Sequence, residues 1–260
     1  MKKNLILFLF LCLPVFALEH EFIPRGRKFR PTFADPREIR MALALQGDMR
    51  LSAIIGNYFS ILSLKEEETS GWDAHFGLEG GGYFIMKQAD HRFPLESADG
   101  LIGLYAESAK GPWQLQLRYT HISAHLADGS NDIPFPYSRE TLHFRSAWVP
   151  RDTLQLYAGM GIITHAVPEA PTMNYQMGLS FFWKDPFELL LPFIATDLKW
   201  RRESSSDPSW TLQVGLALNN PPEAYRSFRF FYSYYTGADP RGQFYLHEIT
   251  VHALGLEMQI

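Results

Sequence analysis

Alternation between apolar and polar residues is the dominant pattern of this chain, and residues 113–128 show it most clearly. One row of that stretch contains Trp113, Leu115, Leu117, Tyr119, His121, Ser123 and His125. The other row contains Gln114, Gln116, Arg118, Thr120, Ile122, Ala124 and Leu126. Because a β-strand points alternate side chains to opposite faces, the pattern predicts a strand with one apolar face. That face ends in His-Ser-His, three groups capable of proton chemistry.

The same period of two recurs along the chain and predicts about twelve strands. The predicted strands are residues 39–45, 51–64, 72–86, 99–107, 113–128, 141–149, 154–162, 174–183, 190–201, 210–218, 227–235 and 254–260. Connections after even-numbered strands are short or rich in Gly and Pro, whereas the connections 88–95, 127–137 and 164–172, after odd-numbered strands, are longer. Short turns at one end and long loops at the other predict an all-β, transmembrane antiparallel barrel of about twelve strands in an outer membrane.

A secreted β-sandwich, for example an extracellular binding module, is the alternative fold, because a buried core also produces alternation. Long strands, abundant aromatic residues and an apolar alternating C-terminal strand favour the barrel. A closed barrel also leaves no unpaired strand edge in the bilayer.

The N-terminus predicts export. Lys2 and Lys3 precede an apolar run and a small-residue cleavage pattern, so residues 1–17 are predicted to be a secretory signal peptide. Residues 18–36 are then predicted to be a periplasmic leader, and residues 37–260 a single barrel domain. Cys12 falls within the signal peptide, so disulfide and thiolate chemistry are excluded from the mature chain.

Charge narrows the class of partner. The net charge of −4 becomes −6 without Lys2 and Lys3, since 22 basic residues then stand against 28 acidic ones. A net negative charge of this size argues against nucleic acid as a partner. An exported barrel is expected to contact outer-membrane lipid and the barrel-assembly machinery of a Gram-negative bacterium. The sequence indicates no cofactor and leaves the oligomeric state open.

Strand order sets the orientation of the barrel. With a periplasmic N-terminus, odd-numbered strands run outward, so residues 127–137 are predicted at the cell surface and residues 150–152 in the periplasm. His121, Ser123 and His125 are then predicted to face lipid near the outer head groups. Glu140 begins the next strand on the same lipid-facing row.

These residue types can perform acyl transfer. An imidazole activates a serine hydroxyl by removing its proton, and a carboxylate orients the imidazole. Residues two apart on a strand lie about 6.6 Å apart, and neighbouring strands about 4.8 Å apart. We therefore predict His121, Ser123 and Glu140 as a catalytic set. A symmetric hairpin would place Glu140 opposite His125, which makes His125 a second candidate for the base.

Other interpretations of the same residues remain open. The histidines and Ser123 can serve only to bind head groups, or His121, His125 and Asp128 can bind a metal ion. A fourth possibility is transport of small solutes. Arg118, Arg145, Asp197 and Lys199 are predicted to face the barrel interior, where they either line a pore or pair with opposite charges and close it.

The His-x-Ser sequence resembles that of two outer-membrane acyl hydrolases, phospholipase A and the lipid A deacylase. This resemblance implies His121 as base, Ser123 as nucleophile and Glu140 as orienting acid, although Ala124-His125 departs from both families after the serine. Most of the mature chain also resembles an uncharacterised family of bacterial outer-membrane barrel proteins. That resemblance is carried by FADPRE at 33–38, GPWQLQLRYTHISAHLAD at 111–128 and SRETL at 138–142.

Overall fold

A computed structural model of the chain describes residues 18–66, 71–171, 173–183, 189–202, 207–218 and 227–259. The predicted signal peptide, residues 1–17, lies outside the described residues. The strands are β1 Leu18–Phe22, β2 Met41–Gln46, β3 Arg50–Glu66, β4 Asp73–Lys87, β5 Leu95–Lys110, β6 Trp113–Leu126, β7 Ser138–Arg151, β8 Leu154–Val167, β9 Met173–Phe182, β10 Leu190–Arg201, β11 Ser209–Leu218, β12 Ser227–Ala238 and β13 Glu248–Gln259. A short 3₁₀ helix, η2, spans Gly242–Phe244. No helix among these residues is long and apolar enough to cross a membrane.

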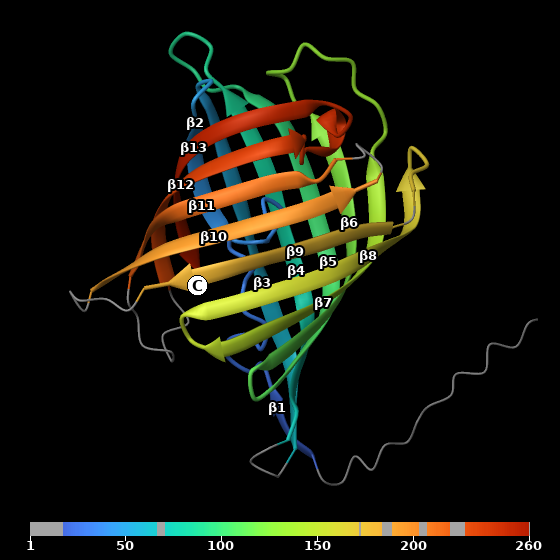
Figure 1. Ribbon diagram of the computed structural model, residues 1–260. Coiled ribbons are helices and arrows are strands. Elements are labelled where there is room, and N and C mark those ends of the chain that lie inside the picture. Colours follow the sequence, from blue (N-terminus) through green and yellow to red (C-terminus); the bar gives the residue numbers. More distant parts are fainter. Residues whose placement is uncertain are drawn as a thin grey trace, which may run out of the picture.

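Twelve of the strands form a closed antiparallel barrel. Each strand from β2 to β13 pairs with its neighbours in sequence, and β13 pairs with β2 from Ala253↔Gln46 to Met258↔Met41. The predicted all-β barrel is therefore confirmed (Figure 1). Several strands extend beyond their predicted bounds, among them β5, β7 and β8, and two differences are larger. β13 begins at Glu248 rather than at residue 254, and β1 was not predicted.

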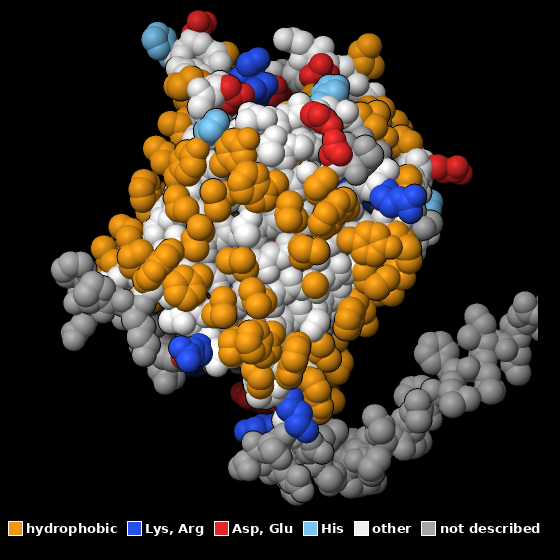
Figure 2. All heavy atoms as spheres, viewed as in Figure 1, with side chains coloured by type: hydrophobic (Ala, Val, Ile, Leu, Met, Phe, Trp, Pro, Cys, Tyr) orange, Lys and Arg blue, Asp and Glu red, His pale blue; other side chains and the backbone are white. Residues whose placement is uncertain are grey.

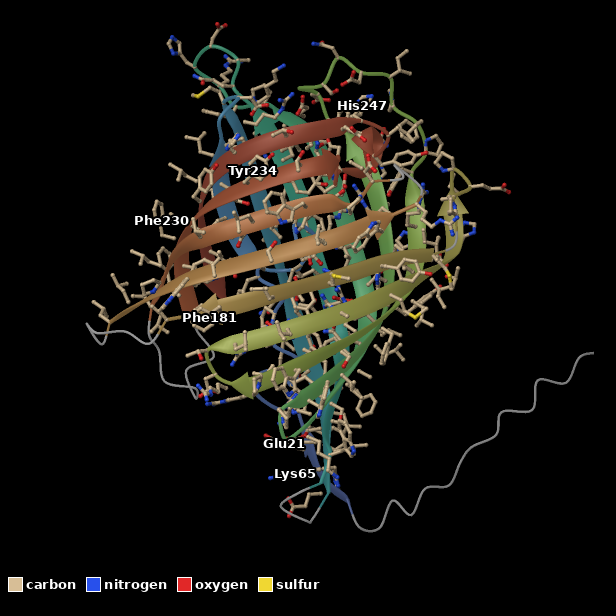
Figure 3. All side chains as sticks on the ribbon, viewed as in Figure 1. Glu21, Lys65, Phe181, Phe230, Tyr234 and His247 are labelled. Atoms are coloured by element: carbon tan, nitrogen blue, oxygen red, sulfur yellow. The ribbon has the colours of Figure 1, made fainter. Side chains whose placement is uncertain are left out.

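The two ends of the barrel differ. The turns between β5 and β6 and between β7 and β8 lie at one end, here called the turn end. The connections 88–94, 127–137 and 239–247 lie at the other, here called the loop end. At the turn end, β3 and β4 continue past the barrel and β1 pairs with β3 from Leu18↔Glu66 to Phe22↔Leu62. Figure 3 shows Glu21 and Lys65 on this three-stranded extension.

The barrel has an apolar exterior and a polar interior. Large apolar side chains such as Ile102, Leu104 and Phe230 are exposed on its outer face. Apolar side chains cover the middle of the face seen in Figure 2, while charged side chains gather near its two ends. Buried inward positions hold Gln116, Glu79 and many other polar residues. A β-sandwich would show the opposite distribution, so burial decides between the two folds suggested by alternation.

The segment from Ile23 to Arg40, here called the leader, lies inside the barrel. Phe29 is buried beside Ala147 and Tyr157. Phe33 packs against a second group of inward residues, which contains Phe182, Phe193 and Phe231. The sequence prediction treated residues 18–36 as a periplasmic leader before the barrel domain, whereas Phe29 and Phe33 pack among the inward residues of the barrel. The physical reason is that the leader supplies the apolar core and the counter-charges that a barrel with a polar interior needs.

Opposite charges fix the leader to the barrel wall. Its basic residues meet wall carboxylates: Arg37 Nη1 lies 2.9 Å from Asp99 and Arg40 Nη1 lies 2.8 Å from Glu257. A third pair joins Arg27 to Glu107, at 2.5 Å. The sequence IPRGRKFRP is thus basic because it occupies an interior lined partly by carboxylates.

Two leader carboxylates meet wall cations in return. Glu38 lies 2.9 Å from Arg145 Nη1 and also accepts hydrogen bonds from Thr32 and Tyr58. Burial raises the pKa of the Glu38 carboxyl, but the guanidiniums of Arg145 and Arg27 outweigh burial and hold that pKa well below its ordinary value. Asp35 lies 2.7 Å from Lys199. Burial raises the pKa of the Asp35 carboxyl, but the charge and hydrogen bond of the Lys199 ammonium, together with the Arg145 guanidinium, lower that pKa below its ordinary value. Both carboxylates are therefore ionised at neutral pH.

The four charged residues predicted to face the interior do so, and all four have partners. Arg118 makes two hydrogen bonds to Glu79, at 2.8 and 2.6 Å. Asp197 accepts hydrogen bonds from Tyr157 and Gln176. Arg145 and Lys199 pair with the leader, as described above. Of the two possibilities, a pore lining or a set of paired charges that closes the interior, these contacts favour the second.

Candidate functional site

The candidate site lies on the outer face of β5 to β8, toward the loop end. Buried Gln116, Arg118 and Thr120 alternate along β6 with the exposed or half-buried row that contains Leu117, Tyr119, His121, Ser123 and His125. Inward residues fill the interior and fix that alternation, so His121 and Ser123 point outward as the sequence predicted. They follow directly on the apolar part of the row.

Register brings Glu140 beside His121. The two residues are direct cross-strand partners in the β6–β7 pair. Glu140 Oε1 lies 3.6 Å from His121 Nδ1, a charge-pair distance that is longer than a hydrogen bond. The other carboxylate oxygen, Oε2, accepts a hydrogen bond of 2.9 Å from the Tyr119 hydroxyl. The side chains of His121 and Glu140 are 44% and 33% exposed, so both remain accessible from outside the barrel.

The position of Glu140 corrects the hairpin register predicted from sequence. A symmetric loop would have put Glu140 opposite His125, whereas Ser123 pairs with Ser138 and His121 with Glu140. The physical reason lies in the loop 127–137. Its final residues turn inward, where Phe135 and Tyr137 pack against Tyr245.

Gln243 of η2 holds this arrangement in place. Its amide donates hydrogen bonds to the carbonyl oxygens of Ala124 and Phe135, at 2.7 and 2.8 Å. The hairpin is therefore asymmetric. Since Glu140 faces His121, the geometry supports His121 rather than His125 as the imidazole that a carboxylate would orient.

Small residues flank Ser123. Gly100 on β5 and Ser138 on β7 are its cross-strand partners. A Cβ atom added to Gly100 would lie 3.9 Å from Ser123 Oγ, so the β5 side of the hydroxyl is uncovered by its partner. Within the described part of the chain the Ser123 hydroxyl has no hydrogen-bond partner. It is not joined to His121 in this state.

Two further groups near Glu140 were missed by sequence reasoning. His165 on β8 is the other cross-strand partner of Glu140. An irregularity between Glu140 and Thr141 leaves Thr164 as an additional residue on β8, and the Thr164 hydroxyl donates to the Glu140 carbonyl oxygen at 3.2 Å. A β-bulge gives no clear signal in one sequence, whereas Tyr119 was visible but was assigned to the apolar row.

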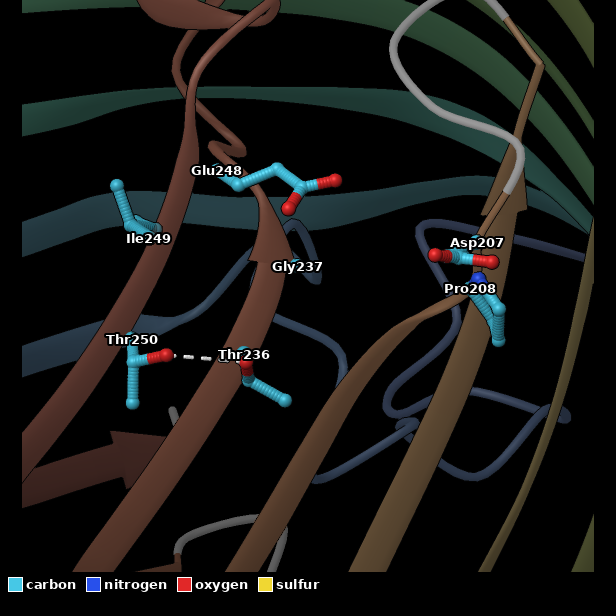
Figure 4. A pocket seen from close by; sticks show the side chains of 7 residues that line it. All are labelled: Asp207, Pro208, Thr236, Gly237, Glu248, Ile249 and Thr250. Carbon is cyan, nitrogen blue, oxygen red and sulfur yellow. Dashed lines mark hydrogen bonds between the residues drawn. The ribbon is translucent and has the colours of Figure 1, made fainter.

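Other possible sites are weaker. No group of three or more His, Cys, Asp or Glu side chains that could hold a metal ion occurs in the residues that the structure describes. A pocket near the loop end lies among Asp207, Pro208, Thr236, Gly237, Glu248, Ile249 and Thr250 (Figure 4). Its two threonine hydroxyls bond to each other at 3.0 Å, and its lining includes no imidazole.

The chemistry open to the site follows from the contacts of His121. Its contact with the carboxylate uses Nδ1, which leaves Nε2 as the nitrogen able to accept a proton. Ser123, two residues after His121 on the same outward row, supplies the hydroxyl that could act as nucleophile. A carboxylate, an imidazole and a hydroxyl in this order are the components of nucleophilic acyl transfer.

Comparison with known proteins places the chain in context. A family model with the description "Protein of unknown function (DUF1207)" matches residues 13–259. No match to the chain was found among the curated proteins. Among solved structures, the chain is similar to outer membrane phospholipase A from Escherichia coli, with a TM-score of 0.57 and 11% sequence identity. The similarity covers 85% of this chain and 89% of that chain.

A second solved structure, the β domain of the Bordetella autotransporter BrkA, gives a TM-score of 0.47 at 13% identity. It covers 85% of this chain and 96% of that chain. At these identities the similarity concerns the fold alone. The barrel is of the outer-membrane type, as the alternating rows predicted.

Proposed function

The chain belongs to the DUF1207 family of proteins of unknown function, and on that premise we propose that it is an outer-membrane barrel with a lipid-facing acyl-ester hydrolase site. His121, Ser123 and Glu140 are the proposed base, nucleophile and orienting acid. The observation that carries the proposal is the outward contact between Glu140 and His121 Nδ1, next to Ser123 on the same row.

Placement on the outer face supports lipid as the substrate. Polar and ionisable side chains at a lipid boundary are costly unless they serve a purpose, and aromatic residues are the more usual choice there. The row leads from Leu117 and Tyr119 directly to His121, so a lipid ester at the head-group level can reach Ser123 without leaving the bilayer. The E. coli neighbour carries the name phospholipase, which agrees with this substrate class.

The proposed reaction has two steps. The Ser123 hydroxyl gives its proton to His121 Nε2 as its oxygen attacks the ester carbonyl carbon, and the protonated imidazole then donates that proton to the departing alcohol. Water, deprotonated by the same imidazole, then attacks the acyl-serine ester, and the imidazolium returns the proton to the Ser123 oxygen as the fatty acid leaves. Glu140 stabilises the imidazolium in both steps without being protonated.

The neighbouring backbone limits how the oxyanion can be held. The N–H of Ala124, the residue after Ser123, donates to the Tyr137 carbonyl at 3.2 Å and is therefore occupied. His125 is the next outward side chain along β6 and is the proposed donor to the oxyanion. This role would explain the departure from the sequence that usually follows the serine in the two hydrolase families.

A non-catalytic structural barrel is the second candidate, and the missing Ser123–His121 hydrogen bond favours it. Catalytic hydrogen bonds are often long before substrate binds, so this observation does not decide between the two. The channel alternative is disfavoured by the leader, which fills the interior and pairs with its charges.

Lipid analysis of membranes that contain the wild-type protein or the Ser123→Ala variant tests the proposal. We expect fatty-acid release and labelling by a serine-directed fluorophosphonate to require Ser123 and His121. Glu140→Gln should lose less activity, because Glu140 orients rather than reacts. Ser146→Ala is the matched control, since Ser146 lies in the outward row of the neighbouring strand β7, opposite Leu115. Unchanged lipid release in the Ser123→Ala strain would leave only the structural role.

A further inference from the structure

Tyr119 contacts the proposed site through its hydroxyl. Its cross-strand partner on β7 is Leu142, two residues from Glu140. The ring therefore lies within the apolar row while the hydroxyl extends to Glu140 Oε2, at 2.9 Å. Tyrosine is common at membrane boundaries, where its hydroxyl usually meets head groups. Here its partner is a carboxylate of the proposed catalytic set.

Each of the three oxygen atoms of Glu140 has a different partner. Oε2 accepts from Tyr119 and Oε1 faces His121, while the backbone carbonyl accepts from Thr164 on β8. Thr164 thus secures the backbone, and Tyr119 is the group that secures the carboxylate. A one-third exposed glutamate has considerable rotamer freedom, and a hydrogen bond to a charged acceptor is stronger than one between neutral groups.

We propose that Tyr119 is a positioning residue, which holds the Glu140 carboxylate against His121 Nδ1. The inference rests on the proposed function and adds a positioning residue to the catalytic set. Its effect passes through Glu140, since among the described residues the Tyr119 hydroxyl bonds to Glu140 and to neither His121 nor Ser123. Removal of the Tyr119 hydroxyl does not displace the nucleophile or the base. It allows the Glu140 carboxylate to rotate away from the imidazole.

Tyr175 provides a matched control. It is also an outward tyrosine, 43% exposed against 40% for Tyr119, and its hydroxyl contacts Met173 Sδ at 3.4 Å. Tyr119→Phe and Tyr175→Phe therefore remove the same atom at similar exposure, and only one of them changes the surroundings of Glu140. Both variants keep the aromatic ring and should fold.

Steady-state hydrolysis of a dispersed acyl ester in mixed micelles separates positioning from substrate binding. We expect Tyr119→Phe to lower kcat about tenfold with KM unchanged, the loss typical of one hydrogen bond to a charged group. Tyr175→Phe should leave both constants unchanged. In a Glu140→Ala background, Tyr119→Phe should cause no further loss, because a residue that acts through Glu140 has nothing left to position.

The outcomes separate the two proposals. If the wild-type protein is inactive, or if its activity survives Ser123→Ala, the proposed function fails. If activity depends on Ser123 but Tyr119→Phe retains full kcat, the positioning role alone is overturned. The same conclusion follows if Tyr119→Phe reduces kcat equally with and without Glu140.

Discussion

Glu38→Gln tests whether the leader is a structural part of the barrel. The substitution keeps the shape of the side chain but removes the charge that faces Arg145 Nη1 at 2.9 Å. Arg27 retains Glu107, whereas the remaining hydrogen-bond partners of Arg145, Gln116 and Thr32, are neutral.

Breaking a buried ion pair by removing one partner costs about 3–5 kcal/mol, because the other charge is left uncompensated. Both Glu38 and Arg145 are almost fully buried, so solvent does little to screen the pair. Glutamine can still accept from Thr32, which places the expected loss near the lower limit, about 3 kcal/mol. In a domain of this size that loss lowers the unfolding midpoint by roughly 6–12 °C.

Heat-modifiable mobility on gels measures that midpoint in detergent. Glu21→Gln is the control, because Glu21 is an exposed carboxylate on β1. Adding Arg145→Met to Glu38→Gln should recover part of the loss, since the uncompensated charge is then removed as well. The reasoning is refuted if Glu38→Gln shifts the midpoint by no more than Glu21→Gln does, or if the second substitution makes the loss larger.

Three further predictions concern pH, substrate access and orientation. The pKa values of Asp35 and Glu38 are depressed in the folded state, so their stabilisation is complete above the ordinary carboxyl pKa of about 4 and declines as pH falls below it. Protonation of these two carboxylates should therefore lower the unfolding midpoint as the pH falls below about 4, and a midpoint that does not change in that range would contradict this assignment. Gly100→Leu should block fluorophosphonate labelling of Ser123 without lowering the unfolding midpoint, whereas Gly100→Ala should label normally, because its Cβ would make only an ordinary contact at 3.9 Å. A tag inserted after Asp132 should bind antibody on intact cells, and binding only after permeabilisation would reverse the proposed orientation.

The twelve barrel strands could be predicted from sequence because one face of each meets lipid and the other a polar interior. That difference produces an alternation of apolar and polar residues that is visible in a single sequence, as in the row from Trp113 to Ser123. β1 could not be found in this way. It has only five residues, and the segment after it has no alternation.

The packing of the leader inside the barrel could not be predicted, because its partners are far away in sequence. Arg40 meets Glu257, and Phe33 meets Phe182, so neither contact produces a local pattern. A usable signal did exist. The leader is basic, and several polar rows of the predicted strands carry carboxylates, among them Asp99 and Glu107. Matching these charges would have suggested that the leader lies inside.

The candidate site was predicted in part. Alternation identified His121, Ser123 and Glu140 as members of outward rows, since it depends only on each strand. The pairing of Glu140 with His121 depends on the path of a loop that Gln243 and Tyr245 hold, more than one hundred residues later. Local spacing contains no information about that contact.

A barrel that encloses its own N-terminal segment can be assembled in only one order. The seam between β13 and β2 contains six residue pairs, and it joins the first barrel strand to the last. If the seam closed first, the bulky side chains of Phe29, Phe33 and Arg37 would have to pass lengthwise through a finished ring. The leader must therefore be in place while the sheet is still open, and the last strand then closes the barrel around it. The leader thus serves as an internal template around which the later strands assemble.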